Sequence, residues 1–581
     1  MNKQELNEAL AFISAPEGEL QIIIYANISG VNEPRRLDIK EEDFSLYLNN
    51  DLNLMHDAKD LYGVEDAYKE IMSEIKKGKK IRVVGDYDID GVCSSYILMK
   101  SLKHFGANVD VRIPDRIKDG YGINDNIINE AANDKVSMII TCDNGIAAHK
   151  QMELANKFGI KVIITDHHEV YQEDGKDYLP VADVVINPKR SDCTYPFKTI
   201  CGALVAYKLV EYIYKRLYGG KLYEDSELGD LLEVAAIATI GDVMPLVDEN
   251  RIIVKNGLKS LMNTKNPGLK ALIKATGMEG KKISAYSIGF VIGPCLNAGG
   301  RLENALVALN MFMSKNSDEA NEYASHLKEL NDERKDLTAG NVKIAIDSAK
   351  SEYINDDILV IYLKNCHESI AGIIAGRVRE ALGKPTIILT DAFGEEGMIK
   401  GSGRSIESYN MFEALYEVKD IFEKFGGHHM AAGMSLKKDR LDEFRKKLNK
   451  NSKLTKEDFI QKIWIDIALP FSYLSIDFVR ELEKLEPYGN KNDKPKFARK
   501  DIKILSKNIL GKSKNVVKMV LEDVDGTRMD GIYFGDGEAF FEELKGKKEI
   551  DIIYYPDINE YGGRESLQVI ITGYKIKIYS K

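Results

Sequence analysis

The chain has 581 residues and a formal net charge of −10, with 44% hydrophobic and 30% charged residues. This length predicts several domains rather than a single core, and the acidic balance gives no general indication of nucleic-acid binding. No stretch approaches the roughly 20 apolar residues of a membrane span, and the N-terminal segment lacks the apolar core of a secretory signal. Six cysteines lie far apart without a CxxC pair, so we expect no disulfide framework, a cytoplasmic location and no membrane partner.

An N-terminal segment, residues 1–60, precedes the first region with a clear pattern. It contains one strand-like run, LQIIIYANI at residues 20–28, followed by an acidic helical stretch. From there to residue 310, short apolar runs alternate with helical patterns, and residues 202–262 have a mostly helical pattern. This alternation predicts a parallel β-sheet with helices on its faces, in a domain of residues 61–310. The predicted strands are residues 81–85, 109–114, 137–141, 161–165 and 183–187.

Three further parts complete the predicted organisation. Residues 311–350 are polar, charged and free of proline, which predicts a linking helix with a break near Gly340. Residues 351–452 repeat the strand–helix–strand pattern and predict a second, smaller α/β domain. Residues 453–581 change to short alternating strands, such as 516–524 and 566–579, and predict an OB-like β-barrel. The predicted fold class is therefore α/β with a C-terminal β-barrel.

The C-terminal part also contains a locally basic stretch. Residues 491–520 contain many lysines and arginines, and their only acidic residues are Asp493 and Asp501. Such a surface can bind a phosphate backbone on an acidic protein, although a lysine-rich solvated face is an equal alternative. Nearby aromatic residues either stack on bases or belong to the core; they are Tyr533, Phe534, Tyr554 and Tyr555.

The motif DYDIDG follows the first predicted strand and places Asp86, Asp88 and Asp90 two residues apart, closed by Gly91. It matches the start of a calcium loop, which needs a bidentate glutamate at its twelfth position and helices on both sides. The twelfth position here is Ile97, and a strand-like run precedes the motif. The calcium loop is therefore excluded, and a solvated acidic turn or a catalytic metal site remains.

Two other predicted strands end in the same kinds of side chain. Asp143 follows residues 137–141 in TCDNG, while Asp166, His167 and His168 follow residues 161–165 in TDHHE. Because ligands bind beyond the carboxyl ends of strands in open α/β sheets, we expect these groups to converge at one edge. Aspartate and histidine without thiolate suit Mn²⁺ or Mg²⁺ better than Zn²⁺, and so many carboxylates suggest two ions. A further acid, Asp242, follows a small-residue helix in ATIGDVMPL.

Taken together, GDYDIDG, IPDRIKDGYG, TCDNG and TDHHE occur in the order and spacing of the DHH phosphoesterase family, which the chain resembles from about residue 50 to its end. CHESIAGIIAGRV, GSGRS and FGGHHMAAG resemble the DHH-associated domain, which binds substrate opposite the metals. PYGNKNDKPKF and the following residues resemble the OB-fold of the family's exonuclease branch. The resemblance implies a metal-dependent exonuclease specific for single-stranded DNA. It would hydrolyse phosphodiester bonds 5′→3′ to mononucleotides in DNA recombination and repair.

Residue by residue, the resemblance implies a centre of two divalent ions, Mn²⁺ or Mg²⁺, that activates water for attack on the phosphate. Asp143 matches the bridging carboxylate, and with His167 and His168 it forms the implied catalytic set. His168 is either a ligand or a group that orients the phosphate, and Asp166 holds a histidine in place. The implied metal ligands are Asp86, Asp88, Asp90, Asp143, His167 and Asp242.

Substrate contacts are expected from cationic side chains and backbone donors. Arg404 in GSGRS can bind a phosphate through two parallel hydrogen bonds, the alternative being an exposed loop arginine. Glycines in FGGHHMAAG allow a strand to approach the backbone closely, while His428 is either a substrate contact or a core histidine. Arg116 and Tyr121 either line the substrate path or belong to a turn. The full expected set is Arg116, Tyr121, Asn297, Arg301, His367, Arg404, Gly427 and His428.

Two positions depart from the family pattern. Val84 stands where many members have a histidine, and Cys295 stands in GPCLNAGGR where an arginine is expected. The first departure puts one ligand or the metal preference in doubt. The second predicts a weaker DNA contact unless Arg301 compensates.

Two other functions stay open. A DHH phosphodiesterase acting on short oligonucleotides or cyclic dinucleotides would share the metal centre, but such relatives lack a C-terminal OB-like domain. A non-catalytic DNA-binding scaffold would have lost its metals, which the retained aspartates and histidines disfavour. For the exonuclease, the expected partner is single-stranded DNA, with a single-strand-binding protein or a helicase as candidate loading partner. We expect the protein to act as a monomer.

Overall fold

The computed structural model describes residues 47–460, 463, 465–511 and 513–576. The strand-like run at residues 20–28 lies outside the described residues. The chain divides into two compact units. The larger contains His56–Met244 and Asn256–Gln461, and the smaller contains residues 47–55, Pro245–Lys255 and the described part of Lys462–Lys581. Within the described ranges, no helix has both the length and the apolar character needed to cross a bilayer.

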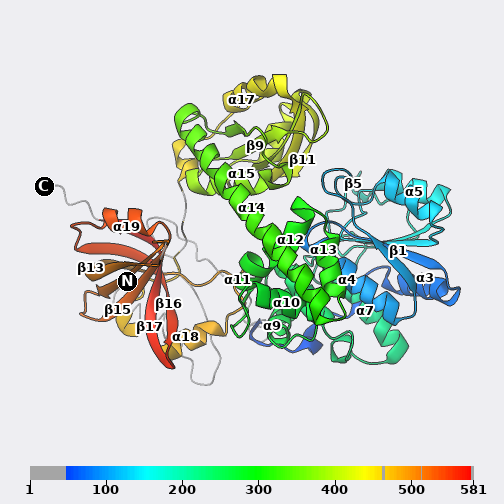
Figure 1. Ribbon diagram of the computed structural model, residues 1–581, viewed down its shortest axis with the longest axis horizontal. Coiled ribbons are helices and arrows are strands. Elements are labelled where there is room, and N and C mark those ends of the chain that lie inside the picture. Colours follow the sequence, from blue (N-terminus) through cyan, green and yellow to red (C-terminus); the bar gives the residue numbers. More distant parts are fainter. Residues whose placement is uncertain (1–46, 461–462, 464, 512, 577–581) are drawn as a thin grey trace. The chain divides into compact units, whose positions relative to one another are not determined.

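A five-stranded sheet organises the first part of the larger unit (Figure 1). Its strand order is β2-β1-β3-β4-β7, and every neighbouring pair is parallel. The inner strands are buried along almost their whole length, which is typical of a parallel sheet covered on both faces. This confirms the predicted alternation. The strands are β1 Lys80–Val84, β2 Asn108–Arg112, β3 Met138–Cys142, β4 Lys161–Thr165 and β7 Val184–Ile186.

The strand order places a switch point beside β1, because β2 lies on one side of β1 and β3 on the other. Ligands of open α/β sheets bind outside the carboxyl ends of the strands at such a point. Helix α4, Ile89–His104, follows β1 almost directly, and the Asp88 side chain caps it by accepting from the backbone N–H groups of Asp90 and Gly91. The other helices of this part are α3 Val64–Lys76, α5 Asp125–Asn133, α6 His149–Lys157, α7 Gly202–Tyr218, α8 Leu231–Gly241, α10 Pro267–Ala275, α11 Ala285–Ser287, α12 Gly293–Leu302 and α13 Leu306–Met313. Helix α9, Asp248–Leu261, belongs to the smaller unit up to Lys255 and to the larger unit from Asn256.

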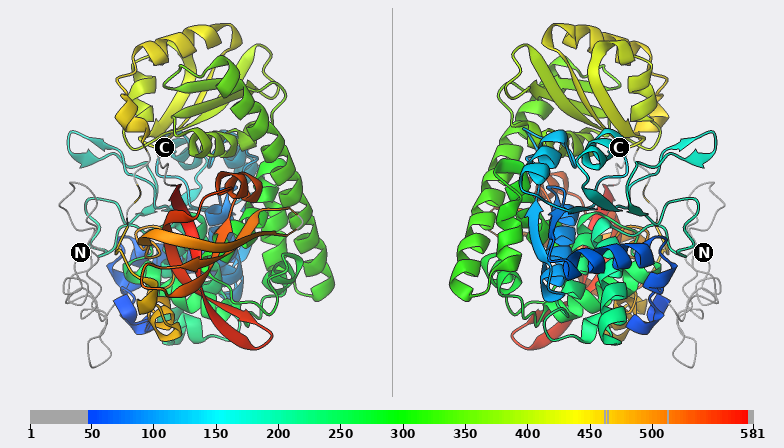
Figure 2. Two further views of the ribbon diagram at one scale, coloured as in Figure 1. Left: turned by 90° about the vertical axis from the view of Figure 1, so that its left-hand side faces the viewer. Right: turned by 90° about the vertical axis from the view of Figure 1, so that its right-hand side faces the viewer.

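The linking helix α14 spans Ser317–Glu352 without interruption (Figures 1 and 2). The predicted break near Gly340 is therefore wrong. One interior glycine costs only about 1 kcal/mol relative to alanine, and tertiary packing outweighs this cost. Helix α14 packs against α10, α12 and α13, and its residues Ala345 and Ala349, beyond Gly340, share an apolar cluster with α15, Ala371–Leu382. Buried side chains on both sides of the glycine, such as Leu327 and Ala345, keep the helix continuous.

A second sheet follows α14 and confirms the predicted smaller α/β domain. Its order is β11-β12-β10-β9-β8, with β8 and β9 parallel and the other pairs antiparallel. The GSGR residues lie on the central strand β10 and the FGGH residues on the edge strand β11. The elements are β8 Leu359–Tyr362, β9 Thr386–Asp391, β10 Met398–Arg404, α16 Met411–Tyr416, β11 Phe422–His428, β12 Ala431–Lys437 and α17 Leu441–Lys450.

The C-terminal part of the smaller unit is a closed barrel of order β13-β14-β15-β17-β16, which confirms the predicted OB-like barrel. Tyr554 is a buried core residue whose hydroxyl donates to the Leu469 carbonyl, so it cannot stack on bases. Phe534 is 59% exposed. The elements are α18 Ile476–Glu483, β13 Phe497–Leu510, β14 Val516–Glu522, β15 Arg528–Phe534, α19 Gly537–Glu543, β16 Glu549–Tyr561 and β17 Arg564–Ile576.

Part of the basic stretch on this barrel is balanced by acids. Arg499 lies 2.8 Å from Asp523, and Lys518 lies 2.8 Å from Asp530. Lys512 lies outside the described residues. The surface is therefore less cationic than the spacing of lysines in the sequence suggests.

A buried arginine fixes the segment Pro245–Lys255 within the smaller unit. Arg251 is 1% exposed and donates hydrogen bonds to the carbonyls of Tyr47, Lys484 and Glu486. Its guanidinium also lies 3.9 Å from the centre of the Tyr47 ring. These contacts join three stretches that are far apart in the sequence.

Candidate metal centre

The acids of the first motif lie in the turn between β1 and α4. Asp86 is buried, and its Oδ1 accepts from the backbone N–H of Gly122 at 3.2 Å. Asp90 is 1% exposed and accepts from the N–H groups of Gly202 at 2.6 Å and Ala203 at 2.8 Å. These donors form the N-terminus of α7, where backbone N–H groups and the helix dipole favour a carboxylate. The start of α7 thus fixes the orientation of Asp90.

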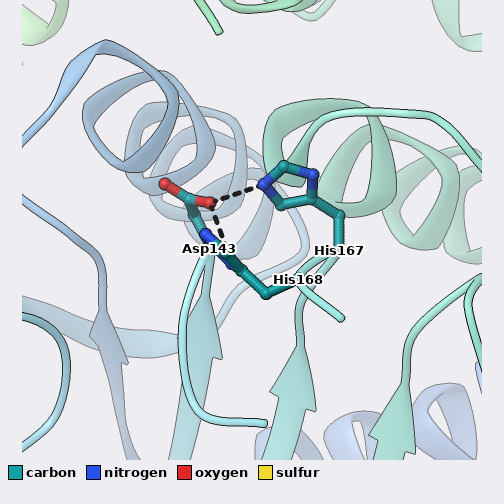
Figure 3. A group of neighbouring side chains, drawn as sticks. All are labelled: Asp143, His167 and His168. Atoms are coloured by element: carbon teal, nitrogen blue, oxygen red, sulfur yellow. Dashed lines mark ion pairs between the residues drawn. The ribbon is translucent and has the colours of Figure 1, made fainter. Parts of the chain in front are cut away.

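Asp143 and the two histidines lie just beyond the ends of neighbouring strands, with both imidazoles directed at the Asp143 carboxylate (Figure 3). His167 Nε2 is 3.1 Å from Asp143 Oδ1. The same nitrogen is 3.6 Å from Asp90 Oδ2 and 3.7 Å from Asp242 Oδ2. The structure therefore brings together the ends of β1, β3 and β4, which the strand pattern predicts, with the residue that caps α8, which the family resemblance alone implied.

His168 occupies a different position from His167. Its Nδ1 is 2.8 Å from Asp166 Oδ1 and 3.9 Å from Asp143 Oδ1. Asp166 is almost fully buried and also accepts from the backbone N–H of Ile146 at 2.9 Å. A carboxylate held in this way fixes the orientation of the imidazole.

Several ligand atoms in this cluster are buried and have no hydrogen-bond partner within the described part of the chain. They are Oδ2 of Asp86, Oδ1 of Asp143, both ring nitrogens of His167 and Oδ2 of Asp242. Asp143, His167 and His168 offer ligand atoms within 4.8 Å of one another, and so do Asp90, His167 and Asp242. Buried acceptors without donors are costly unless a cation satisfies them. Carboxylate oxygens with imidazole nitrogens suit Mn²⁺ and Mg²⁺, so the residues present fit a divalent metal centre.

The electrostatics of the cluster lead to the same conclusion. Burial and the neighbouring Asp88 raise the pKa of Asp86 to about 8. Burial, Asp90 and Asp88 raise the pKa of Asp242 to about 8. The pKa values of Asp90 and Asp143 are also raised, chiefly by burial. Like charges so close together cannot all ionise without a cation among them.

The pKa values of the two histidines are shifted in opposite directions. Burial lowers the pKa of His167 below its ordinary value, although Asp90 opposes this effect. The pKa of His168 is raised to about 9, because Asp166 outweighs the effect of burial. His167 is therefore suited to act as a neutral metal ligand, and His168 is suited to carry a proton.

A cationic cavity of about 800 Å³ lies in the same unit, lined by Arg116, Arg301 and Arg404 together with residues of the second sheet. Arg301 donates to the Ser369 carbonyl at 2.8 Å, and Arg404 donates to Ser402 Oγ at 2.8 Å. Burial and neighbouring arginines hold the pKa values of Arg301 and Arg404 below the ordinary arginine value. Guanidinium groups that repel one another are stabilised by a bound anion such as a phosphate.

The other predicted substrate residues take several different positions. Tyr121 belongs to the metal centre, since its hydroxyl donates to the Asp143 carbonyl at 2.8 Å and lies 3.2 Å from His168 Nε2. Asn297 Oδ1 accepts from the backbone N–H of Ile89 at 2.9 Å and so fixes the start of α4.

Three more predicted contacts lie in the second domain. His367 Nδ1 is 2.7 Å from Ser369 Oγ, and His428 is exposed at the end of β11; neither is among the residues that line the arginine cavity. Gly427 has φ +153°, and a Cβ there would lie 2.4 Å from the Ala431 carbonyl oxygen. This glycine is therefore required by the backbone of the hairpin.

Sequence reasoning missed several residues of the site. Lys400 and Ser402 line the arginine cavity beside Arg404. Their alternation on one strand is a signal that could have identified them, because residues two apart share a face of a sheet. Lys424 on β11 also lines the cavity. Gly202, whose N–H holds Asp90, carries no signal in the sequence.

Both departures from the family pattern are core residues. Val84 ends β1 and is fully buried in the apolar cluster beneath the sheet. Cys295 is fully buried, donates from Sγ to the Val291 carbonyl at 3.3 Å and accepts from Asn331 on α14 at 3.4 Å. All six cysteines are free and buried.

Comparison with known proteins adds three matched segments to this geometry. Residues 80–239 match the DHH family, N-terminal domain, residues 355–453 match the DHHA1 domain, and residues 465–573 match the RecJ OB domain. Together they define a DHH-type protein with an OB domain.

The full-length relatives narrow this class. The chain is 35% identical to the single-stranded-DNA-specific exonuclease RecJ of Bacillus subtilis over 91% of its own length and 65% of that protein. It is 32% identical to the exonuclease of the same name from Escherichia coli, over 88% of the chain and 90% of that protein. The chain belongs to the RecJ family.

Solved structures agree with this assignment. RecJ from Thermus thermophilus in complex with Mn²⁺ superimposes with a TM-score of 0.77 at 26% identity, over 94% of this chain and 77% of that one. A further exonuclease RecJ, bound to manganese, matches with a TM-score of 0.58 at 30% identity, over 67% of this chain and 94% of that one. Both of these relatives contain the metal that the ligand atoms here suit.

Proposed function

We propose that the protein is a single-stranded-DNA-specific exonuclease that hydrolyses phosphodiester bonds 5′→3′ to mononucleotides in DNA recombination and repair. One observation carries the proposal: buried, unsatisfied carboxylate and imidazole atoms converge at the switch point of the sheet, in the same unit as an arginine-lined cavity. The names of the bacterial relatives support the substrate. The direction of hydrolysis depends on the family resemblance alone.

The proposed cofactor is a pair of divalent ions, Mn²⁺ or Mg²⁺, held by Asp86, Asp88, Asp90, Asp143, His167 and Asp242. Such ions, when bound, activate water and neutralise charge on the phosphate. The number of carboxylates supports a pair rather than a single ion, because a carboxylate such as that of Asp143 can bridge two ions, whereas His167 can bind only one through Nε2.

The chain's own residues would position the strand and move protons. Arg116, Arg301 and Arg404 would bind phosphates of the DNA in the cavity that they line. His168, held by Asp166 and close to the Tyr121 hydroxyl, can hold a proton at the edge of the metal centre. The barrel would add contacts that do not depend on sequence, with Phe534 as an exposed stacking surface.

We further propose that the enzyme acts as a monomer in the cytoplasm, with a single-strand-binding protein or a helicase as loading partner. The six free cysteines support a reducing compartment. A phosphodiesterase for short oligonucleotides or cyclic dinucleotides is less favoured, because the RecJ OB domain match covers residues 465–573. The retained ligand set disfavours a scaffold without catalysis.

The test is digestion of a single strand of about fifty nucleotides, labelled at either end, in the presence of Mn²⁺. We expect the 5′-labelled strand to release a labelled mononucleotide at once, while the 3′-labelled strand shortens progressively. Asp143→Asn should abolish both products, and Asp66→Asn, which changes an exposed aspartate of α3, should not. Intact long DNA together with cleaved dinucleotides would instead establish the small-substrate phosphodiesterase.

A further inference from the structure

A second cavity, of about 620 Å³, lies in the helical part of the larger unit. Its walls come from α4, α8 and α10, from the segment before α8 and from the end of α13. It shares no lining residue with the arginine cavity, and none of its residues is a candidate metal ligand. Cavities of a few hundred Å³ are the size that small-molecule ligands occupy.

The floor of this cavity is a fixed hydrogen-bond network. The Tyr96 hydroxyl donates to Asp230 Oδ2 at 2.7 Å, and Asn266 Nδ2 donates to the Tyr96 oxygen at 2.7 Å. Lys100 Nζ binds the other oxygen of Asp230 at 2.6 Å. Because each group has a partner, the floor is preorganised rather than free to collapse.

Glu233, in the wall of the cavity, differs from the groups of the floor because only one of its two carboxylate oxygens accepts a well-formed hydrogen bond. Its side chain is 3% exposed, and its Oε1 accepts from Ser260 Oγ at 2.7 Å. Its Oε2 is buried and has no hydrogen bond of ordinary length and angle among the residues that the structure describes, although the Thr264 side chain lies close enough to the carboxylate to lower its pKa. A buried carboxylate oxygen without a donor is costly, so Glu233 offers an acceptor to any cationic group that enters the cavity.

The charge and the rings of the cavity favour the same kind of ligand. Carboxylates outnumber lysines in the lining, and one lysine, Lys100, is already paired with Asp230. Two lining rings already face ammonium groups: Lys100 Nζ lies 5.5 Å from the centre of Tyr96, and Lys221 Nζ lies 5.6 Å from the centre of Tyr223. Aromatic faces attract cations in this geometry. The lining acids are Glu224, Asp225, Glu227, Asp230 and Glu233, and the lining lysines are Lys100, Lys265 and Lys315.

We propose that this cavity binds a small aliphatic polyamine. One ammonium group would donate to Glu233 Oε2. A second would lie between Glu224 and Glu227 at the rim, in exchange for Lys221, which lies 3.7 Å from Glu224, and His104, which lies 3.0 Å from Glu227. A divalent metal needs several oxygens within about 2.0–2.6 Å of a single point, whereas these carboxylates are spread around a large cavity. Separate charges along a flexible chain match that spread. The site is independent of the proposed nuclease activity.

The test is isothermal titration of the full-length, Mn²⁺-loaded protein with spermidine at about 0.15 M salt, which screens non-specific surface attraction. We expect saturable binding of one spermidine per chain. Glu233→Gln should weaken this binding at least about tenfold, the effect of losing one charge-assisted hydrogen bond. The rim double variant Glu224→Gln/Glu227→Gln should weaken it several-fold and, because both side chains are exposed, should fold normally.

Two controls locate the site. Asp143→Asn, in the metal centre, and Glu65→Gln, an exposed glutamate on α3, should leave spermidine binding unchanged. Unchanged spermidine affinity in both Glu233→Gln and the rim variant would overturn the proposal. So would loss of binding in Asp143→Asn, which would assign the amine to the metal centre. Displacement of spermidine by equimolar Mg²⁺ would show a plain acidic surface. None of these readouts requires DNA cleavage, so the proposal and the nuclease assignment can fail separately.

Discussion

Gly202 provides a direct test of how the metal centre is held, because it is not itself a ligand. It is the first residue of α7, and its N–H donates to Asp90 at 2.6 Å. A Cβ at this position would lie 2.7 Å from the Asp143 Cβ and 3.0 Å from Asp143 Oδ1. Gly202→Ala therefore forces Asp143 and the start of α7, which holds Asp90, apart without removing a ligand.

The displacement follows from the contact distances. Ordinary van der Waals contact begins at 3.4 Å, so Asp143 or the start of α7 must move by about 0.7 Å, and overpacking of this kind costs about 1–3 kcal/mol. Metal sites tolerate errors of only about 0.2 Å in ligand distance. We therefore expect Mn²⁺ affinity to fall about 10- to 100-fold, a loss comparable with that caused by disturbing groups that orient ligands.

The assay is Mn²⁺ titration calorimetry on the purified variant, combined with urea unfolding. The control is Gly340→Ala in α14, where a Cβ would meet no heavy atom within 4 Å. That variant should bind Mn²⁺ normally and gain about 0.5–1 kcal/mol of stability, because alanine is the better helix former. Mn²⁺ affinity of Gly202→Ala within twofold of the unmodified protein would refute the view that α7 and Asp143 pack at their closest limit.

Three further outcomes are expected. Asp86 and Asp242 have pKa values raised to about 8 in the folded protein, so the folded state binds protons more tightly than the unfolded state. Without metal, in the presence of a chelator, the melting temperature should therefore fall as pH rises from about 5 to 8. Mn²⁺ should raise the melting temperature more at pH 8 than at pH 6; a chelated protein that melts higher at pH 8 would contradict this. Arg404→Lys should raise the KM for single-stranded DNA about tenfold with little change in kcat, because lysine cannot bind a phosphate through two parallel hydrogen bonds. Arg377→Lys, at an exposed arginine, serves as the control. An unchanged KM for Arg404→Lys would show that Arg404 does not contact the substrate. Arg251→Ala should lower hydrogen-exchange protection of residues 484–492 about 100-fold, matching about 3 kcal/mol of lost charged hydrogen bonds, while Lys259→Ala on the same helix should not.

The metal centre could be predicted from the sequence because its residues follow a simple geometric rule. Asp86, Asp143 and His167 each come just after a buried strand, and parallel strands bring their carboxyl ends to one edge. Asp242 is different, because it follows a helix rather than a strand, and only the family resemblance predicted it as a metal ligand. The sequence pattern alone would have left it an ordinary surface aspartate.

The parts that could not be predicted depend on tertiary packing. Gly340 suggests a break by local propensity, but contacts of α14 on both sides of it keep the helix intact. Tyr554 is an aromatic residue of the type that stacks on bases, but it is buried inside the barrel. The arginine cavity combines Arg116 and Arg301 of the first domain with β10 of the second, and no local pattern indicates that these segments meet.

The unbroken helix α14 also constrains how the arginine cavity can open. At about 1.5 Å per residue, its 36 residues form a strut of about 54 Å between the two α/β parts. Because α12 and α15 both pack against this helix, and β10 packs against α15, the helix holds Arg301 on α12 and Arg404 on β10 at a defined spacing. A cavity whose walls keep a fixed separation does not have to close before it binds. The proposed phosphate contacts would therefore form without a movement of one α/β part against the other, which lowers the cost of binding.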